Sequence, residues 1–412
     1  MQQRLSIQVQ GQAVETTTIA LKNFANQPGP VLALGAELKS SLCILADGQA
    51  TFTEHLGDLA SPVNYRRYLA AVDALREILT EKCSTAAPLT IACDLHPDYA
   101  ASRYARTLAE RVIGVQHHHA HIVSAMADNE LAGPVVGISC DGTGYGEDGT
   151  IWGCEVLLCD QADFTRAGHL KTFPLIGGDA AARQTWRPAT ALLYETMGAN
   201  FDASALGRID PQALALMRRQ LDAGASMRTS SLGRLFDAAA FLLGLCDYNE
   251  QEAQGPIALE AAACQCPAAE PLGWQLETNA AGVIEMDYRP MVRDILAGQA
   301  SGRAVAELAR AFHETLAAML ARCAVEVARN AKVEKVVLSG GCFMNRILTE
   351  RLEELITQTG LRVYTHQCVP CSDVGIALGQ AIVASAKKKK KFTAKERKEK
   401  TRDKRANCKT VA

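Results

Sequence analysis

Residues 135–160, VVGISCDGTGYGEDGTIWGCEVLLCD, consist of two runs of β-favouring residues on either side of a glycine-rich turn. Residues 30–49, PVLALGAELKSSLCILADGQ, have the same pattern, with two short apolar runs separated by GAELKSS. Strand and helix patterns alternate after both stretches. The sequence therefore predicts a duplicated α/β unit in which a strand-turn-strand segment opens each copy, with a cleft between the copies.

The later part of the chain supplies the other elements of this pattern. Residues 303–332 have the apolar spacing of one long amphipathic helix. Residues 333–345, VEKVVLSGGCFMN, are typical of a buried strand that runs into a glycine turn, and residues 346–360 of a helix closed by its glycine. We expect four parts: an irregular N-terminal extension (1–30), a first lobe (31–134), a second lobe with insertions and a C-terminal helix (135–386), and a basic tail (387–412).

The composition indicates a globular protein. With 412 residues, 48% hydrophobic and 21% charged, the chain can bury a large core. It contains no apolar run long enough to span a membrane, and its first residues, MQQRLSIQVQ, lack a signal pattern, so we expect no membrane association and a cytoplasmic location. The 14 cysteines are scattered, mostly in apolar stretches, which favours reduced thiols over a disulfide framework.

Charge is distributed unevenly along the chain. The tail at 387–412 holds 13 Lys and Arg against three Asp and Glu, whereas the rest of the chain holds 30 against 42. We expect the tail to be disordered. A nucleic-acid surface needs a basic face, so the acidic body disfavours a nucleic-acid partner, although the tail leaves weaker polyanion binding open.

Residues 115–130, VQHHHAHIVSAMADNE, place four histidines at the start of a predicted helix. His117 and His121 are four positions apart, so both side chains lie on one helix face and can converge on a single metal ion. A zinc-protease helix would need Glu directly after the first His, where this chain has His118. The alternative is a polar helix start, and only the glycine-flanked acidic motifs elsewhere favour the metal pair.

Two glycine turns follow predicted strands. Glycines there would let backbone N–H groups approach phosphate oxygens. The first turn also offers an aspartate as a metal ligand, and the second precedes a helix. Each turn could equally be a plain connection between elements. The residues concerned are Asp141, Gly142, Thr143 and Gly144 in the first turn, and Gly340, Gly341 and Asn345 in the second.

Three further motifs carry polar residues into helix starts. In SSLGRLFDAAAFLLG, Arg234 could pair with a phosphate and Asp237 with ribose hydroxyls, or both could belong to an ordinary helix start. Glu260 follows another glycine turn, and Asp373 has the position of a helix N-cap. The pair CVPC at 368–371 is a weak zinc or redox signal because no second pair accompanies it.

In this order and spacing, the motifs LALGAELK, DLHPDY, VQHHHAH, CDGTGYGEDG, GGDAAARQTWRPA, SSLGRLFDAAAFLLG, LSGGCFMNRIL and SDVGIALGQA resemble the C-terminal, Kae/TsaD-like carbamoyltransferase domain of the hydrogenase maturation factor HypF. The resemblance runs from about residue 31 to 386. The fold family also includes TsaD and antibiotic-pathway O-carbamoyltransferases, which are similar to actin-like and sugar-kinase ATPases. The resemblance implies a duplicated, two-lobed actin-like/sugar-kinase-like (ASKHA) fold with a central nucleotide cleft.

The resemblance also implies roles for individual residues. It makes four side chains the ligands of an Fe or Zn ion: His117, His121, Asp141 and Asp373. It gives the ATP/AMP moiety of carbamoyladenylate a binding site formed by Gly142, Thr143, Gly144, Gly233, Arg234, Asp237, Glu260, Gly340, Gly341 and Asn345. It places Lys39 in the first phosphate-facing turn as a catalytic residue. The run VPCSDVG departs from the Pro-Asn-Asp-Gly-like pattern expected around Asp373.

The implied reaction is carbamoyl transfer from carbamoyladenylate to the C-terminal cysteine of HypE, a step in making the cyanide ligand of [NiFe]-hydrogenase. A YrdC-like domain or protein is the implied source of carbamoyladenylate, because the sequence shows no motif for such a domain. Two alternatives stay open. One is carbamoyl transfer to another acceptor, a tRNA adenosine or a small-molecule hydroxyl, and the other is a nucleotide- and metal-binding module without turnover.

Overall fold

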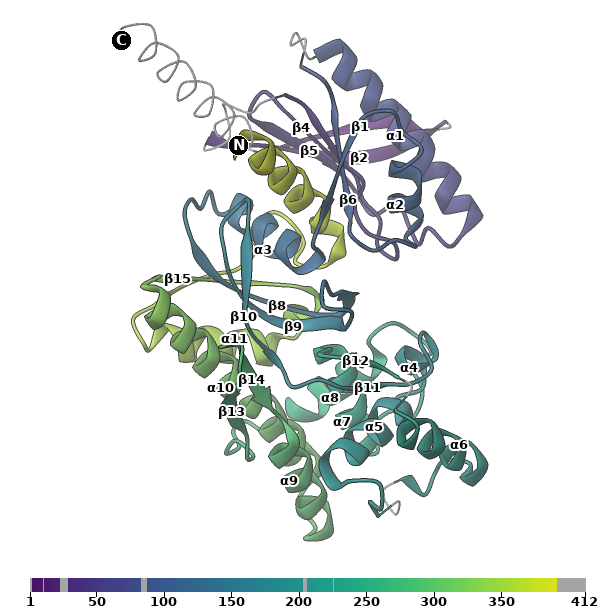
Figure 1. Ribbon diagram of the computed structural model, residues 1–412, viewed down its shortest axis with the longest axis vertical. Helices are drawn as coiled ribbons and strands as arrows, with labels where there is room; N and C mark the ends of the chain where they lie inside the picture. The colour runs from purple at the N-terminus through teal and green to yellow at the C-terminus, as the bar shows by residue number, and fades with distance from the viewer. Residues whose placement is uncertain are drawn as a thin grey trace, which may run out of the picture. The chain divides into compact units, whose positions relative to one another are not determined.

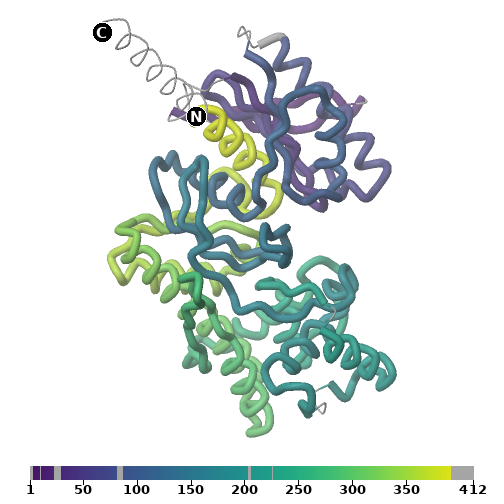
Figure 2. The backbone as a smooth tube through the Cα atoms, in the orientation of Figure 1, coloured from purple at the N-terminus to yellow at the C-terminus, as the bar shows by residue number. Residues whose placement is uncertain are grey.

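The computed structural model describes residues 2–9, 11–22, 29–82, 87–202, 206–224 and 226–390. The chain divides into two compact units. The first unit comprises Met1–Gly133, Cys159–Phe164 and His366–Ala412, and the second comprises Pro134–Leu158 and Thr165–Thr365. Figure 2 follows the path of the chain through both, from purple at the N-terminus to yellow.

The first unit is built on a seven-stranded sheet with the order β1-β2-β5-β4-β3-β6-β7. Neighbours β3, β6 and β7 are parallel, whereas β4 and β5 are antiparallel to their neighbours. The strands are β1 (Gln2–Val9), β2 (Gln12–Ala20), β3 (Val31–Ala33), β4 (Cys43–Ala46), β5 (Gln49–Thr53), β6 (Thr90–Asp94) and β7 (Arg111–Val115).

Helices cover both faces of this sheet (Figure 1). On one side, α1 (Pro62–Lys82) and α2 (Ala100–Ala105) bury an apolar stripe that includes Tyr68 and Leu75 against the strands. On the other side lie α3 (His117–Asp128) and the helix at 376–390, which are packed together. The apolar spacing seen in the sequence of α1 therefore marks its core-facing side.

The second unit contains a nine-stranded sheet. Its main path has the order β13-β14-β10-β9-β8-β15-β16, and β11 and β12 pair with each other beside β9. The strands are β8 (Val135–Tyr145), β9 (Ile151–Cys159), β10 (Phe164–Leu170), β11 (Phe173–Leu175), β12 (Met227–Thr229), β13 (Gln275–Thr278), β14 (Ile284–Asp287), β15 (Lys335–Ser339) and β16 (Arg362–Tyr364).

The helices of the second unit surround a large apolar core. The long helix α10 buries residues on most of its faces, Phe312 and Leu316 among them. The helices are α4 (Ala180–Arg183), α5 (Trp186–Met197), α6 (Pro211–Asp222), α7 (Leu232–Leu242), α8 (Gln254–Ala263), α9 (Arg289–Ala300), α10 (Val305–Ala331) and α11 (Arg346–Thr357), with short 3-10 turns η3 (Gly341–Met344) and, in the first unit, η4 (Asp373–Gly375).

The two sheets share one connectivity, which confirms the predicted duplication. In the first unit the central order is β5-β4-β3-β6-β7, and in the second it is β10-β9-β8-β15-β16. In each case a strand-turn-strand segment begins this shared part of the sheet, and the two later strands join parallel to its first strand, β3 or β8. Each unit therefore repeats the same α/β plan, as the paired openings in the sequence predict.

The structure differs from the expected organisation at both ends of the chain. The segment expected to be an irregular extension contains β1 and β2, which pair antiparallel along their whole length and join the sheet through β5. Their many Gln and Thr residues hide a period-two pattern whose inward side chains include Val9 and Val14. At the other end, residues 387–390 continue the last helix, and the rest of the predicted tail, 391–412, lies outside the described residues.

The division between the units also differs from the expected boundary at residue 135. Residues from His366 onward belong to the first unit, although they follow the strands of the second unit in sequence. The reason is a set of contacts with α3, described below, that links positions about 240 residues apart.

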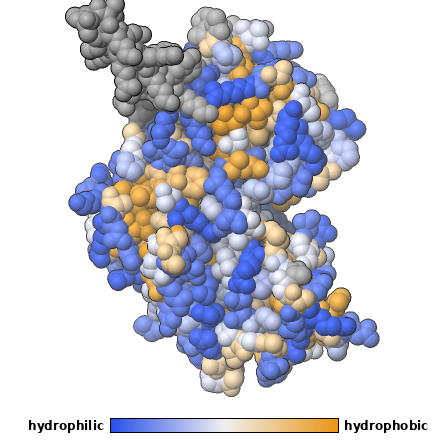
Figure 3. All heavy atoms as spheres, in the orientation of Figure 1, coloured by the Kyte–Doolittle hydropathy of each residue, from blue (hydrophilic) through white to orange (hydrophobic). Residues whose placement is uncertain are grey.

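Hydrophilic residues cover most of the face shown in Figure 3, and apolar residues occur in separate areas among them. No helix in the described ranges is both long and apolar enough to cross a membrane. The cysteines of the described ranges are all free thiols, as predicted.

Candidate metal centre and glycine loops

The predicted histidine helix forms at the carboxyl end of a parallel strand. β7 ends at Val115, and α3 begins two residues later at His117. Gln116 caps the helix, because its side-chain oxygen accepts a hydrogen bond from the backbone N–H of His119 at 2.9 Å. Ligand sites of open α/β sheets lie at this edge.

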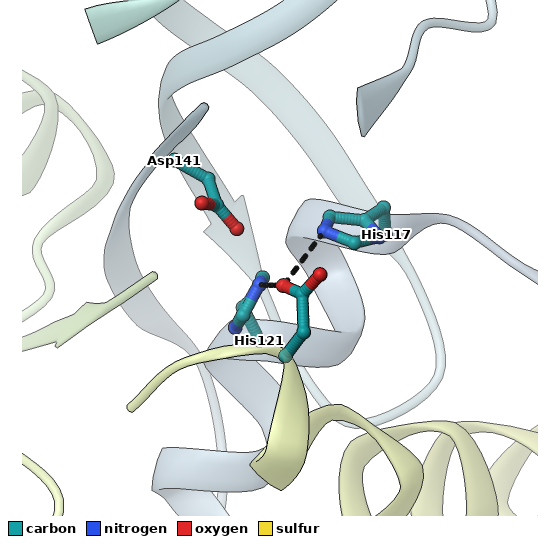
Figure 4. A group of neighbouring side chains, drawn as sticks. His117, His121 and Asp141 are labelled. Atoms are coloured by element: carbon teal, nitrogen blue, oxygen red, sulfur yellow. Dashed lines mark hydrogen bonds and ion pairs between the residues drawn. The ribbon is translucent and has the colours of Figure 1, made fainter. Parts of the chain in front are cut away.

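His117 and His121 converge on the carboxylate of Asp373. Nε2 of His117 lies 3.5 Å from Oδ1 of Asp373, and Nε2 of His121 lies 3.2 Å from the same oxygen. In Figure 4 dashed lines join the labelled imidazoles of His117 and His121 to one carboxylate, which these two distances identify. Both histidines are 1% exposed, and one ligand atom from each of the three residues lies within 4.8 Å of the other two. The first unit thus brings together two imidazoles and one carboxylate.

A fourth side chain, Asp94, fixes the orientation of the first imidazole. It ends β6, is 2% exposed, and accepts a hydrogen bond from Nδ1 of His117 at 2.9 Å. This bond leaves Nε2 of His117 to face Asp373. A carboxylate behind a ligating histidine is the usual second partner at metal sites. Asp94 is not among the site residues predicted from the sequence, although DLHPDY places it at a strand end.

The geometry of these groups fits a bound cation. Because Nδ1 of His117 donates to Asp94, a neutral imidazole turns the lone pair of Nε2 toward an oxygen of Asp373. Two electron-rich atoms in this arrangement need a proton or a metal ion between them. Burial would raise the pKa of the Asp373 carboxyl, but when the two imidazoles are protonated, their hydrogen bonds and charges hold it well below its ordinary value. The carboxylate is therefore ionised and available as a ligand.

The other two histidines of the motif serve the packing of α3. Nε2 of His119 donates to the backbone oxygen of Asp160 at 2.7 Å, and its ring contacts Phe164. Burial lowers the pKa of His119 to about 4, so this ring is neutral. His118 is fully buried, and its Nδ1 lies 3.3 Å from the side-chain nitrogen of Gln116.

Asp141 and Lys39 lie in different units. Lys39 is half-buried in the connection between β3 and β4 of the first unit. Asp141 belongs to the second unit, where it follows the buried part of β8 and accepts a hydrogen bond from the backbone N–H of Gly142 at 2.7 Å. It is the third residue labelled in Figure 4.

Within the second unit, the predicted phosphate glycines approach one another closely. A Cβ atom on Gly233, at the start of α7, would lie 3.0 Å from Cα of Gly142. A Cβ atom on Gly340, whose φ is +107°, would lie 2.2 Å from the backbone oxygen of Cys140, and one on Gly341 would lie 3.1 Å from Oδ1 of Asp141. These positions need glycine because three backbone segments meet there. Thr143 is exposed and Gly144 buried, both within β8.

Arg234 and Asp237 pair with each other. Their side chains are 2.9 Å apart, and Asp237 also accepts from Asn249 Nδ2 at 2.8 Å. Asp237 is 0% exposed, and this burial raises its pKa even though Arg234 and Asn249 act in the opposite direction. The carboxylate expected to meet ribose hydroxyls is therefore engaged inside the unit, where it holds the first turn of α7.

Asn345 and Glu260 both cap α11. The side-chain oxygen of Asn345 accepts from the N–H of Leu348 at 2.9 Å, and Glu260 accepts from the N–H of Arg346 at 2.7 Å. The Nδ2 of Asn345 also lies 3.0 Å from Nε2 of His313. Both side chains thus satisfy helix N–H groups that a phosphate would otherwise meet, and they fix the position of the preceding glycine turn.

A buried carboxylate that the sequence analysis missed supports the same region. Glu155 on β9 is 0% exposed and accepts from Arg166 Nε at 2.6 Å, from the backbone N–H of Gly153 at 3.1 Å, and from the hydroxyl of Ser230. The next residue, Ser231, caps α7, because its hydroxyl oxygen accepts a hydrogen bond from the backbone N–H of Arg234. The same hydroxyl donates to the backbone oxygen of Gly142. Glu155 therefore stabilises the contact between Gly142 and the start of α7.

We expect Glu155→Gln to lower the free energy of unfolding by about 2–3 kcal/mol, since every described partner of Glu155 is a donor and an amide nitrogen would face donors. The matched control is Asp148→Asn, which changes the other carboxylate bound to Arg166 but at a 43% exposed side chain, where a loss below about 1 kcal/mol is expected. Urea denaturation measures both. Equal losses in the free energy of unfolding for the two variants would contradict this stabilising role of Glu155.

Comparisons with known proteins agree over most of the chain. The model described as "HypF Kae1-like domain" matches residues 26–128, and the model described as "Carbamoyltransferase, Kae1-like Domain, second subdomain" matches residues 137–380. The "Carbamoyltransferase HypF homolog" of Cupriavidus necator is 38% identical over 373 residues, which cover 86% of this chain and 91% of that protein. "Carbamoyltransferase HypF" of Rhizobium leguminosarum bv. viciae is 36% identical, over 86% of this chain and 45% of that protein.

Two solved structures show the same fold. Full-length HypF in its phosphate- and nucleotide-bound form matches with a TM-score of 0.82 and 30% identity, over 93% of this chain and 50% of that chain. The T. kodakarensis HypF structure matches with a TM-score of 0.79 and 26% identity, over 93% and 52% of the two chains. The chain thus spans nearly all of the C. necator relative and about half of the other proteins described here.

Proposed function

Because this chain belongs to the HypF family of carbamoyltransferases, we propose that it transfers a carbamoyl group during hydrogenase maturation, from carbamoyladenylate to the C-terminal cysteine of a HypE-like protein. The observation that carries the proposal furthest is the convergence of the buried His117 and His121 on the half-buried Asp373, with His117 oriented by Asp94. Such a group has no packing role that apolar residues would not fill better.

We propose that this group holds an Fe or Zn ion, with Asp141 as a fourth ligand. Imidazole nitrogens and carboxylate oxygens suit both metals. When bound, the ion would supply a positive charge that polarises an oxygen of the carbamoyladenylate. The protein's part is to orient the His117 imidazole so that its Nε2 faces Asp373, through the hydrogen bond to Asp94, and to keep Asp373 ionised.

The glycine loops of the second unit support a site for the nucleotide part of the donor. A Cβ atom on Gly340 or Gly341 would crowd Cys140 or Asp141, so this turn is kept free of side chains, and the backbone N–H groups of such glycine turns stabilise phosphate oxygens. A solved HypF of this fold contains both phosphate and nucleotide. We propose that the AMP moiety binds here, with Thr143, Gly144, Gly233 and Arg234 around it, and that Asp237, Glu260 and Asn345 hold the loops in place. Lys39 is proposed to approach the phosphate.

In the proposed reaction, the acceptor thiolate attacks the carbamoyl carbon and forms a carbon–sulfur bond. The bond from that carbon to the phosphate oxygen breaks, and AMP leaves with the electron pair. The thiol's proton is released to solvent before the attack. The metal and the glycine loops would stabilise the charge that develops on the departing phosphate, and no cysteine of this chain is needed.

We expect the HypE-like acceptor to gain one carbamoyl group when it is mixed with this chain, a YrdC-type enzyme, ATP and carbamoyl phosphate. Mass spectrometry of the intact acceptor measures the gain. Replacing the acceptor's C-terminal cysteine with alanine, or omitting the YrdC-type enzyme, should abolish it. If the complete mixture leaves the HypE-like acceptor unchanged but carbamoylates tRNA or a small hydroxyl compound, the acceptor proposed here is wrong.

A further inference from the structure

The last residue of α3, Asp128, binds the backbone of a distant segment. Its carboxylate, with a side chain 2% exposed, accepts hydrogen bonds from three consecutive backbone N–H groups: Gln367 at 2.6 Å, Cys368 at 2.9 Å and Val369 at 3.1 Å. A run of N–H groups around one anion fixes the backbone conformation of a turn. This turn begins six residues before Asp373.

Two more contacts on the same side of α3 hold the residues that follow. The hydroxyl of Ser124 donates to the backbone oxygen of Gly375 at 2.7 Å. Gly379 packs directly on the backbone of Ala120, where a Cβ atom would lie 1.8 Å from the Ala120 oxygen. Ala120, Ser124 and Asp128 are spaced four residues apart, so they form one stripe along α3.

This stripe runs beside the stripe of metal-site histidines. His117 and His121 precede Ala120 and Ser124 by three residues each, so the two stripes are neighbours on one helix. One stripe presents the two imidazoles, and the other holds the segment that carries Asp373. A single twelve-residue helix therefore sets the distance between both kinds of ligand.

An aspartate at this position is unfavourable for the helix itself. The C-terminal end of a helix carries partial negative charge, so a carboxylate there normally destabilises it. The nearest titratable ring, His366, has its Nδ1 3.8 Å from the carboxylate, and burial lowers the pKa of His366 to about 3, which leaves it neutral. The backbone N–H groups of the turn are therefore the described partners that offset the charge of Asp128.

We propose that Asp128 is a positioning residue of the metal centre: by binding the turn at residues 367–369, it places the Asp373 carboxylate opposite His117 and His121. The inference rests on the proposed metal site and assigns a role to a residue that touches none of the ligands. It predicts that Asp128 contributes to metal affinity more than to folding, because Ser124 and Gly379 also hold the segment.

The test compares Zn²⁺ affinity of the purified full chain with that of Asp128→Asn, which keeps the side-chain size and one acceptor oxygen. Chelator competition should show that Asp128→Asn binds Zn²⁺ about 10–100-fold more weakly than the wild type, the range typical of residues that hold metal ligands in position. Glu130→Gln is the matched control, since that nearby carboxylate is 43% exposed and its Oε1 lies 3.7 Å from Nζ of Lys22. It should bind Zn²⁺ like the wild type.

Two further readouts separate positioning from general stability. Thermal melting of the metal-free proteins should show Asp128→Asn fully folded at the temperature of the binding assay, and the visible spectrum of bound Co²⁺ should change because the carboxylate is displaced. An Asp128→Asn protein with wild-type Zn²⁺ affinity and an unchanged Co²⁺ spectrum would overturn the positioning role alone. A wild-type chain that binds neither ion would overturn this inference together with the metal site.

Discussion

Purified His117→Ala and His121→Ala variants will each lack stoichiometric iron or zinc, whereas His118→Ala will retain the wild-type content. His117→Ala and His121→Ala each remove a proposed nitrogen ligand from a site with few others, so the loss of metal affinity should exceed the roughly 10–100-fold typical of residues behind the ligands. His118→Ala removes a ring that is equally buried but lies outside the proposed ligand group. The comparison therefore separates metal binding from helix packing.

Elemental analysis of the three proteins after dialysis measures this directly. Thermal melting provides the control for folding, because all three substitutions leave a cavity in the packing around α3 and should destabilise the protein to a similar extent. Equal metal content in the three variants would show that the i, i+4 pair does not bind the ion.

Gly340→Ala will destabilise the second unit by about 3 kcal/mol or more and abolish nucleotide binding by the folded fraction. Two effects add at this position. The φ of +107° is unfavourable for any L-residue with a side chain, and the new Cβ would overlap the backbone of Cys140 at 2.2 Å. To remove this overlap, the turn must move away from β8. That movement separates Gly341 from Asp141.

The matched control is Gly149→Ala, which has a φ of +79° but no atom within 4 Å of the new Cβ. It should cost only the conformational strain, about 1–2 kcal/mol, and leave nucleotide affinity unchanged. Urea denaturation and calorimetric titration with AMP measure the two quantities. A Gly340→Ala protein as stable as Gly149→Ala would show that the turn has room that the structure does not provide.

Local patterns were sufficient to predict much of the fold. The paired strand-turn-strand openings predicted the duplicated sheets, and the apolar spacing of residues 303–332 predicted α10 to within two residues. The predicted face shared by His117 and His121 is also present. These features depend on residues that are close in sequence, so a periodic pattern is enough to reveal them.

The roles that could not be predicted from the sequence depend on contacts between residues far apart in the chain. Asp94 follows a buried strand like many structural aspartates, and only its contact with His117 gives it a role. Glu155 lies within a strand whose other inward residues are apolar, so its pattern gave no sign of Arg166 and Ser230. Conversely, Asn345 and Glu260 fit the expected motif by position, yet their side chains cap a helix.

The contact between α3 and the Asp373 segment has a consequence for synthesis on the ribosome. His121 and Asp373 are separated by 252 residues. At about 5–20 residues per second, roughly 13–50 s pass between the emergence of the histidine pair and the emergence of its carboxylate partner. During that interval α3 lacks the segment that packs against it. The proposed ligand group is thus completed only late in synthesis.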